Sequence, residues 1–159
     1  MNIKEIIAKK RDGLELNKEE IKYFIEEYTK GTVTDYQAAA LIMTMYINGL
    51  NSEETTNLTL EMAHSGEILD LSKVNGIKVD KHSTGGVGDK TTLVVAPIVA
   101  SCGVCIAKMS GRGLGFTGGT IDKLESIDGF KVNLTDKEFI DQLNSINVAI
   151  SSQTGNLTP

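Results

Sequence analysis

Residues with the chemistry to hold an anion gather in two glycine-rich stretches. The first, VDKHSTGGVGDKTTL at residues 79–93, places a lysine, a histidine and several hydroxyl side chains around three glycines. The second, SGRGLGFTGGT at residues 110–120, has five glycines in eleven residues. Glycine allows backbone N–H groups to approach an anion closely, and cationic or hydroxyl side chains supply further donors. We interpret the two stretches as halves of one anion-binding site.

A nucleotide is one candidate anion, but neither stretch carries a complete nucleotide-binding motif. The first is not a P-loop, because Lys90 follows Asp89 where that motif needs glycine. The second has the Gly-x-Gly-x-x-Gly spacing at 113, 115 and 118, yet only Glu138 is a candidate for the acidic partner of a dinucleotide site. Free phosphate fits better, since it takes many donors from several directions. The candidate donors are Lys81, Ser83, Thr92, Ser110 and Thr120.

His82 lies between Lys81 and Ser83, beside the predicted anion site. An imidazole in this place could act as a general acid or donate a hydrogen bond to a leaving group. His64 has no comparable neighbours and is interpreted as an ordinary residue at the end of a helix. His82 is therefore the candidate catalytic residue.

Apolar periodicity and capping signals predict helices over the first third of the chain. Asn17 with Glu20 has the pattern of a capping box, and Ser52 is the expected cap of the fourth helix. Thr34 or Asp35 is expected to cap the third helix, YQAAALIMTMYINGL, which Gly49 stops. This helix is too apolar to be solvated and must be buried in a bundle or in a subunit interface. The predicted helices are residues 3–8, 17–28, 36–48 and 52–64.

After Gly76 the pattern alternates between strands and helices. Strands are predicted at 77–83, 104–110 and 148–153, and helices at 89–102, 118–127 and 136–146, the last opened by a Thr135–Glu138 capping box. This order indicates a parallel sheet with helical crossovers, in which ligands bind at the carboxyl ends of the strands. We expect an α/β protein with a helical domain at 1–66, a linker at 67–78 and an incomplete α/β domain at 79–159.

Composition excludes several classes of function. The net charge is −5, and the one basic cluster, Lys9, Lys10 and Arg11, is interpreted as the solvated face of a helix, so nucleic acid is not an expected partner. No apolar run approaches the length of a membrane span, and the N-terminus lacks a signal-peptide core. Cys102 and Cys105 are expected to be buried structural thiols rather than a redox or zinc site, which favours a cytoplasmic protein.

The sequences KHSTGGVGDKTTL and KMSGRGLGFTGGTIDKLES closely resemble the motifs of the pyrimidine-nucleoside and thymidine phosphorylases. The resemblance covers essentially the whole chain but only the N-terminal part of that family. It implies cleavage of a pyrimidine nucleoside by inorganic phosphate, with no organic cofactor, in a homodimer formed through the helical domain. It also implies that the Arg and Lys that grip the base lie beyond Pro159, so the chain is expected to be an N-terminal portion.

The resemblance also assigns roles to individual residues. His82 corresponds to the histidine that contacts the pyrimidine and assists its departure, and Leu114 to an apolar position against the base. Gly88 and Lys90 correspond to positions that bind potassium in some members, although Lys90 replaces a frequent threonine. Phe116 stands where members usually have histidine. The implied phosphate-binding residues are Lys81, Ser83, Thr92, Lys108, Ser110 and Thr120.

Two other functions remain open on the sequence. One is a non-catalytic, dimerising phosphate-binding module, because the catalytic set is incomplete. The other is a related phosphoribosyltransferase, which would need an acidic pair to bind magnesium. Asp122 and Glu125 are the local candidates for that pair, and they are interpreted more simply as the solvated face of a helix.

Overall fold

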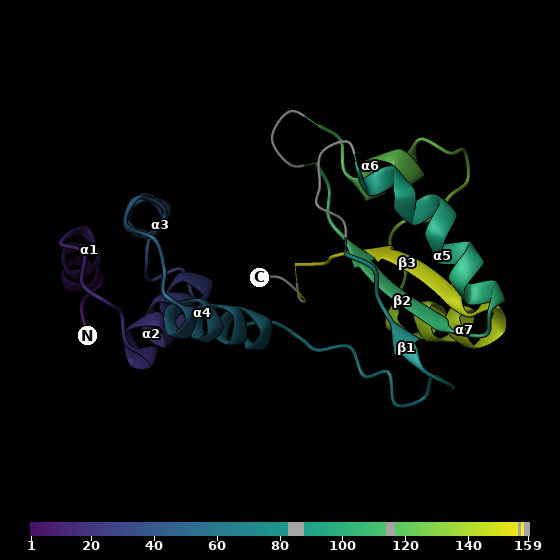
Figure 1. The fold of residues 1–159 in the computed structure, drawn as a ribbon, viewed down its shortest axis with the longest axis horizontal. Coiled ribbons are helices and arrows are strands. Elements are labelled where there is room, and N and C mark those ends of the chain that lie inside the picture. Colours follow the sequence, from purple (N-terminus) through teal and green to yellow (C-terminus); the bar gives the residue numbers. More distant parts are fainter. Residues whose placement is uncertain (83–87, 114–116, 156, 158–159) are drawn as a thin grey trace. The chain divides into compact units, whose positions relative to one another are not determined.

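The computed structural model describes residues 1–82, 88–113, 117–155 and 157. The chain forms two compact units, one covering Met1–Ile68 and the other Leu69–Gly155 (Figure 1). Each unit has its own hydrophobic clusters. Within the described residues, no helix is long and apolar enough to cross a membrane.

The first unit consists of helices, which end close to the predicted boundaries. The capping box of Asn17 and Glu20 is present, with Glu20 N–H donating to Asn17 Oδ1 at 2.9 Å. The predicted cap of the fourth helix was wrong by one residue: Asn51, not Ser52, accepts from Glu54 N–H at 2.8 Å. Asparagine reaches the exposed N–H groups of the first turn as well as serine does. The helices are α1 (Ile3–Arg11), α2 (Lys18–Thr29), α3 (Asp35–Asn48) and α4 (Ser52–His64).

The apolar helix α3 is buried on only one side. Ala38, Leu41 and Met45 pack into the cluster formed with α1 and α2. On its other side Tyr46 is 82% exposed and Ile47 71%. Burial within this bundle therefore accounts for only part of the apolar surface that α3 carries.

The interpretation of the basic cluster as solvated was wrong for Lys10. Its side chain is buried, and its ammonium group donates to Glu54 Oε1 at 2.7 Å. Glu54 is also buried, and it accepts backbone N–H groups from Leu16 and Asn51. A charge inside a core needs a hydrogen-bonded partner of opposite sign, and here that partner is 44 residues away in the sequence.

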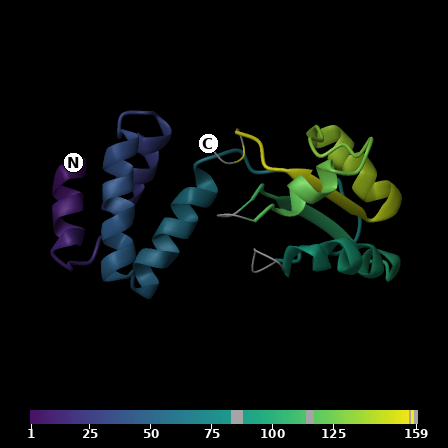
Figure 2. The same cartoon turned by 90° about the horizontal axis from the view of Figure 1, so that it is seen from above.

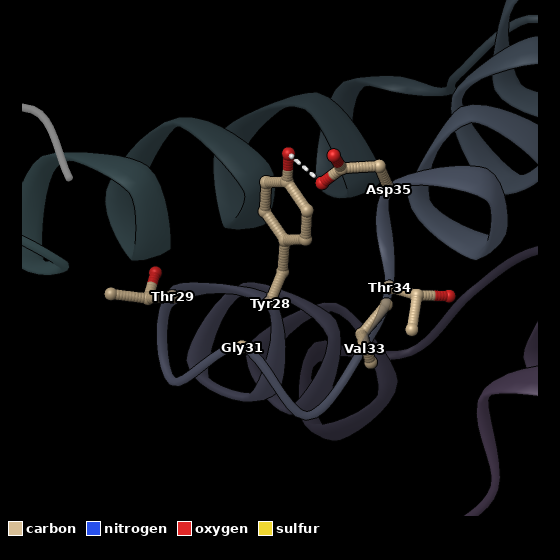
Figure 3. Close-up of a pocket in the computed structure, with 6 residues that line it drawn as sticks. All are labelled: Tyr28, Thr29, Gly31, Val33, Thr34 and Asp35. Atoms are coloured by element: carbon tan, nitrogen blue, oxygen red, sulfur yellow. Dashed lines mark hydrogen bonds between the residues drawn. The ribbon is translucent and has the colours of Figure 1, made fainter.

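A shallow hollow marks the turn from α2 to α3 (Figure 3). Gly31 supplies the left-handed backbone conformation of this turn, with φ of 77°. The hydroxyl of Tyr28 donates to Asp35 Oδ1 at 3.3 Å across the hollow. None of the predicted site residues lines it.

In the second unit the described strands form a parallel sheet in the order β1–β2–β3. The strands are β1 (Lys78–Val79), β2 (Cys105–Ser110) and β3 (Val148–Ser152). The helices are α5 (Thr91–Ser101), which follows the 3₁₀ turn η1 (Gly88–Lys90), α6 (Thr120–Glu125) and α7 (Asp136–Ile146). This arrangement confirms the predicted fold class of a helical unit followed by a parallel-sheet α/β unit.

Helices cover both faces of this sheet. Cys105 and Ala149 pack against Phe139 and Leu143 of α7, whereas Ile150, the next residue of β3, packs against the cluster of α6. Successive side chains of a strand point to opposite faces, so α6 and α7 lie on different sides. Figure 2 shows α5 across the sheet from α7. Leu69, Leu71 and Val74, in the segment expected to be a linker, also pack in the α7 cluster.

Two further local predictions, both in the second unit, were wrong. The first strand was expected over 77–83, but β1 contains only Lys78 and Val79. The backbone N–H of Lys81 bonds to Asp80 Oδ1 at 2.6 Å instead of to a neighbouring strand. The two cysteines were expected to be buried, yet Cys102 is exposed in the turn after α5 and only Cys105 is buried. Burial raises the pKa of the Cys105 thiol.

Candidate functional site

The predicted anion-binding residues lie at the carboxyl ends of β1 and β2. Lys81 and His82 come two and three residues after the end of β1, and Ser110 is the last residue of β2. Since the two strands are parallel and paired, these ends meet at one edge of the sheet. Lys108 and Ser110 are two residues apart and therefore share one face of β2.

Lys81 connects the end of β1 to the start of α5. Its ammonium group donates to Thr91 Oγ1 at 2.8 Å and to Thr92 Oγ1 at 3.3 Å. Thr91 in turn donates its hydroxyl to the carbonyl of Gly88 at 2.8 Å. Lysine has three N–H donors, and among the described residues Lys81 uses two of them. A cation and the buried hydroxyl of Thr92 are thus held side by side at the edge of the sheet.

Lys108 is a second cation in the same network. Its side chain is buried, and its ammonium group donates to the carbonyl of Lys81 at 2.8 Å. The carboxylate of Asp80 lies 3.3 Å from the same nitrogen. Asp80 also accepts the backbone N–H of Lys81. One carboxylate therefore contacts the backbone of Lys81 and the ammonium group of Lys108. The two lysines together with Asp80 keep a net positive charge, which suits an anion.

Ser110 and Thr120 occupy the corresponding ends of the next strand–helix segment. Ser110 pairs with Ser152 in the register of β2 and β3, and its carbonyl accepts from Gln153 N–H at 3.3 Å. Thr120 is the first residue of α6 and is buried. Within the described part of the chain, hydrogen bonds join Lys81, Thr92 and Lys108, and they do not extend to Ser110 or Thr120.

The remaining predicted residues divide into two groups. His82 is exposed next to Lys81, and Gly88 and Lys90 form the ends of η1. Ser83 and Leu114, together with Phe116, lie outside the described residues. No group of three or more His, Cys, Asp or Glu side chains in the described ranges is arranged to hold a metal ion.

Sequence reasoning missed the ion pairs that support this edge of the sheet. Asp89, which had no predicted role, is buried and paired with Lys123 at 2.8 Å. Arg112 donates to Glu125 at 2.6 Å and to Asp122 at 3.1 Å. The i, i+3 spacing of Asp122 and Glu125 could have indicated a shared cationic partner, because it puts both carboxylates on one face of a helix. The two side chains are partly exposed, as a solvated face requires, but both are paired with Arg112.

The pKa values of this cluster follow from those contacts. Hydrogen bonds from Arg112 hold the pKa of Glu125 below its usual range. The backbone N–H of Gly119, followed by Arg112, lowers the pKa of Asp122. Glu125 and then Asp122 raise the pKa of Arg112. Each group is therefore fixed in its charged form near neutral pH.

Two domain models of one family match the chain in order. The model described as "Glycosyl transferase family, helical bundle domain" matches residues 4–66. The model described as "Glycosyl transferase family, a/b domain" matches residues 75–159.

Relatives with assigned names agree with these matches. The pyrimidine-nucleoside phosphorylase of Geobacillus stearothermophilus is 61% identical over all 159 residues, and that of Staphylococcus haemolyticus is 60% identical over the same length. The chain spans 37% of the length of each of these relatives.

A solved structure supports the fold independently. The crystal structure of anthranilate phosphoribosyltransferase from Thermus thermophilus superposes with a TM-score of 0.69, over 92% of this chain and 45% of that one, at 19% identity. At this identity the likeness concerns the fold alone. Because both domain models match in order and the sequence identity to named relatives is about 60%, the chain belongs to the glycosyl transferase family that includes the pyrimidine-nucleoside phosphorylases.

Proposed function

We propose that the protein acts as a pyrimidine-nucleoside phosphorylase, cleaving uridine- or thymidine-type nucleosides with inorganic phosphate to give the free base and a pentose 1-phosphate. The observation that carries this proposal is the network of Lys81, Thr92 and Lys108 at the carboxyl ends of β1 and β2. It supports the proposal because it holds two cations and a buried hydroxyl together at the carboxyl ends of parallel strands, where α/β proteins bind ligands. The identity of 61% to a named phosphorylase supports the same activity.

The proposed reaction exchanges one bond at the anomeric carbon for another. The bond from that carbon to the base nitrogen breaks, its electron pair leaves with the base, and a phosphate oxygen forms the new bond to carbon. Positive charge develops on the sugar and negative charge on the base. Bound phosphate stabilises the first, and a donor such as His82 stabilises the second. Holding phosphate in place also makes its attack effectively unimolecular.

The proposed phosphate ligands are those assigned from the sequence, Ser83 and the Ser110 and Thr120 hydroxyls included. Leu114 is proposed to contact the base.

Potassium fits the site less well than phosphate does. Of the two candidate residues Gly88 offers a carbonyl, which already accepts from Thr91, but Lys90 offers an exposed cationic side chain in place of a threonine oxygen. An ammonium group repels a cation, so no step is assigned to potassium.

We further propose a homodimer formed through the helical unit, in the cytoplasm. The exposed apolar side chains of α3, led by Tyr46 and Ile47, support an interface on that helix. Free thiols at Cys102 and Cys105 agree with a reducing compartment.

A phosphoribosyltransferase is less well supported by the site. Its magnesium would need free carboxylates, and Asp122 and Glu125 are both engaged by Arg112. Their lowered pKa values reflect that engagement rather than a site held ready for a metal.

Phosphate-dependent turnover is the deciding experiment. The protein is incubated with uridine or thymidine, with and without phosphate, and the free base is quantified. We expect base release only with phosphate. Melting temperature is measured in the same samples, because phosphate at a hundredfold over its Kd should add about 2.7 kcal/mol of stability. A phosphate-induced rise in melting temperature without turnover would instead identify a non-catalytic phosphate-binding module.

A further inference from the structure

Asp89 is a buried carboxylate that the proposed chemistry does not use. It lies in η1, the turn that leads into α5, and is 3% exposed. The ammonium group of Lys123, in α6, donates to Asp89 Oδ1 at 2.9 Å and to Oδ2 at 2.8 Å. This hydrogen bonding is the main reason that the pKa of Asp89 is lowered. Both oxygens of a buried anion are thus held by one cation from a helix 34 residues further along the chain.

Lys123 has no donor left for a ligand. Its third hydrogen bond goes to the carbonyl of Gly118 at 2.6 Å, so all three N–H groups of its ammonium are used. The side chain therefore joins three pieces of backbone: η1, the segment that leads into α6, and α6 itself. Its contacts hold these segments together and leave no donor for phosphate.

Each member of the pair lies three residues from one of the two buried threonines assigned to phosphate. Asp89 precedes Thr92 by three residues, and Lys123 follows Thr120 by three residues on α6. Thr92 and Thr120 are 0% and 3% exposed. Residues three apart on a helix lie on the same face. A contact between Asp89 and Lys123 therefore restrains the start of α5 against the start of α6.

The α6 end of this contact is itself held to the residues after β2. Arg112 binds Glu125 through both of its terminal nitrogens, and Asp122 accepts the backbone N–H of Gly119 at 2.8 Å. A Cβ atom on Gly119 would lie 2.5 Å from the carbonyl oxygen of Arg112, so the backbones touch there. Because α6 is held in place on this side, the Asp89–Lys123 ion pair also holds the start of α5 in a defined position relative to α6.

We propose that Asp89 and Lys123 are positioning residues for the phosphate site, which set the distance between the Thr92 and Thr120 hydroxyls without touching phosphate. The proposal rests on the proposed function, because it takes both threonines as phosphate ligands. Electrostatic stabilisation depends on donors being fixed before the reaction. The alternative is that the pair contributes only to fold stability, in which case its loss lowers the melting temperature and leaves phosphate binding unchanged.

The test compares Lys123→Met with the rescue variant Lys123→Arg. Lys137→Met is the matched control, since Lys137 forms an exposed pair with Asp141 within α7 and joins no second element. The KM for phosphate and kcat are measured at saturating nucleoside. We expect the phosphate KM to rise about tenfold in Lys123→Met, within the range of coupling seen for contacting residues. Arginine should restore most of the loss, and Lys137→Met should behave as the unmodified protein.

Binding is measured separately, as the rise in melting temperature that phosphate produces. This readout keeps the inference testable even if the protein turns over no nucleoside. Absence of turnover would refute the proposed function but not the positioning role. A phosphate-induced rise that is large in the unmodified protein and small in Lys123→Met supports positioning. Equal rises in melting temperature, or an unchanged phosphate KM in folded Lys123→Met, overturn the positioning role. An unmodified protein that shows neither turnover nor a phosphate-induced rise in melting temperature overturns it as well.

Lys123→Met leaves a buried carboxylate unpaired and could fail to fold. The double variant Asp89→Asn/Lys123→Met removes the buried charge together with its partner, and the same KM and melting measurements are applied to it. A raised phosphate KM in the folded double variant supports positioning, and an unchanged KM overturns it.

Discussion

At the scale of single residues, the proposed role of His82 is the one that an experiment tests most directly. It is exposed beside Lys81, whose ammonium group is engaged by Thr91 and Thr92. We predict that His82→Ala lowers kcat about a hundredfold, as expected for loss of a proton donor, while the KM for phosphate stays nearly constant. Steady-state kinetics with each substrate varied in turn separate the two effects.

The control for this variant is His64→Ala. His64 is also an exposed histidine, but it is the last residue of α4 in the other unit. Its replacement should leave both constants unchanged. An unaltered kcat in His82→Ala would remove His82 from the mechanism, and a large rise in phosphate KM would reassign it to phosphate binding.

The sequence was sufficient to name candidate ligand-binding residues by their type, but not residues that act by pairing with a distant partner. Lys81, Thr92 and Lys108 could be named because motif and resemblance singled them out, and the structure joins them. Asp89 and Lys123 could not, because 34 residues separate them and neither has a chemical role visible by itself. For the same reason Lys10 was placed on a solvated face although Glu54 neutralises it in the core.

At the scale of elements, α7 shows how capping couples stability to pH. Glu138 accepts from Lys131, and from the backbone and hydroxyl of Thr135, and these contacts lower its pKa to about 2. An unfolded glutamate has a pKa of about 4.3. The folded pKa is the lower one, so the stabilisation is present above about pH 4.3 and is lost as the pH falls towards 2.

We therefore predict that Glu138→Gln flattens the dependence of melting temperature on pH between about 5 and 2. The melting temperature is measured across this range for the variant and for Glu53→Gln. Glu53 is an exposed glutamate in the first turn of α4, and its replacement controls for the loss of one surface carboxylate. Parallel curves for Glu138→Gln and the unmodified protein would contradict the assigned contribution of the capping box.

The elements were predictable where local signals decide them. The boundaries of α7 were predicted to the residue, because the Thr135–Glu138 box fixes its start and the periodic apolar face continues to Ile146. The length of β1 was not, because strand pairing depends on a partner elsewhere in the chain. After Val79 the backbone of Lys81 bonds to side chains, the Asp80 carboxylate and the Lys108 ammonium group, instead of to the backbone of β2.

At the scale of the whole molecule, the two units have separate cores. The cluster of the first unit runs from Ile3 to Leu58, and the clusters of the second lie between Leu69 and Ile150. The most deeply buried charges of the first unit are Lys10 and Glu54, at 3% and 1% exposed. Burial opposes the ionisation of Glu54, but the hydrogen bonds that it accepts lower its pKa, so its charge is retained at neutral pH. The donors are Leu16, Lys10 and Asn51.

We predict that Lys10→Met destabilises the first unit by about 3–5 kcal/mol, the usual cost of leaving one partner of a buried ion pair uncompensated. Lys9→Met is the matched control, because the neighbouring Lys9 pairs with Glu20 but is 32% exposed, and such pairs contribute about 1 kcal/mol or less. Native-state amide hydrogen exchange resolves the effect by element. Exchange should accelerate in α1 to α4 and keep its rate in β2, β3 and α7. Uniform acceleration in both units would show instead that their cores unfold together, and equal effects of the two variants would show that burial of Lys10 adds nothing to its ion pair.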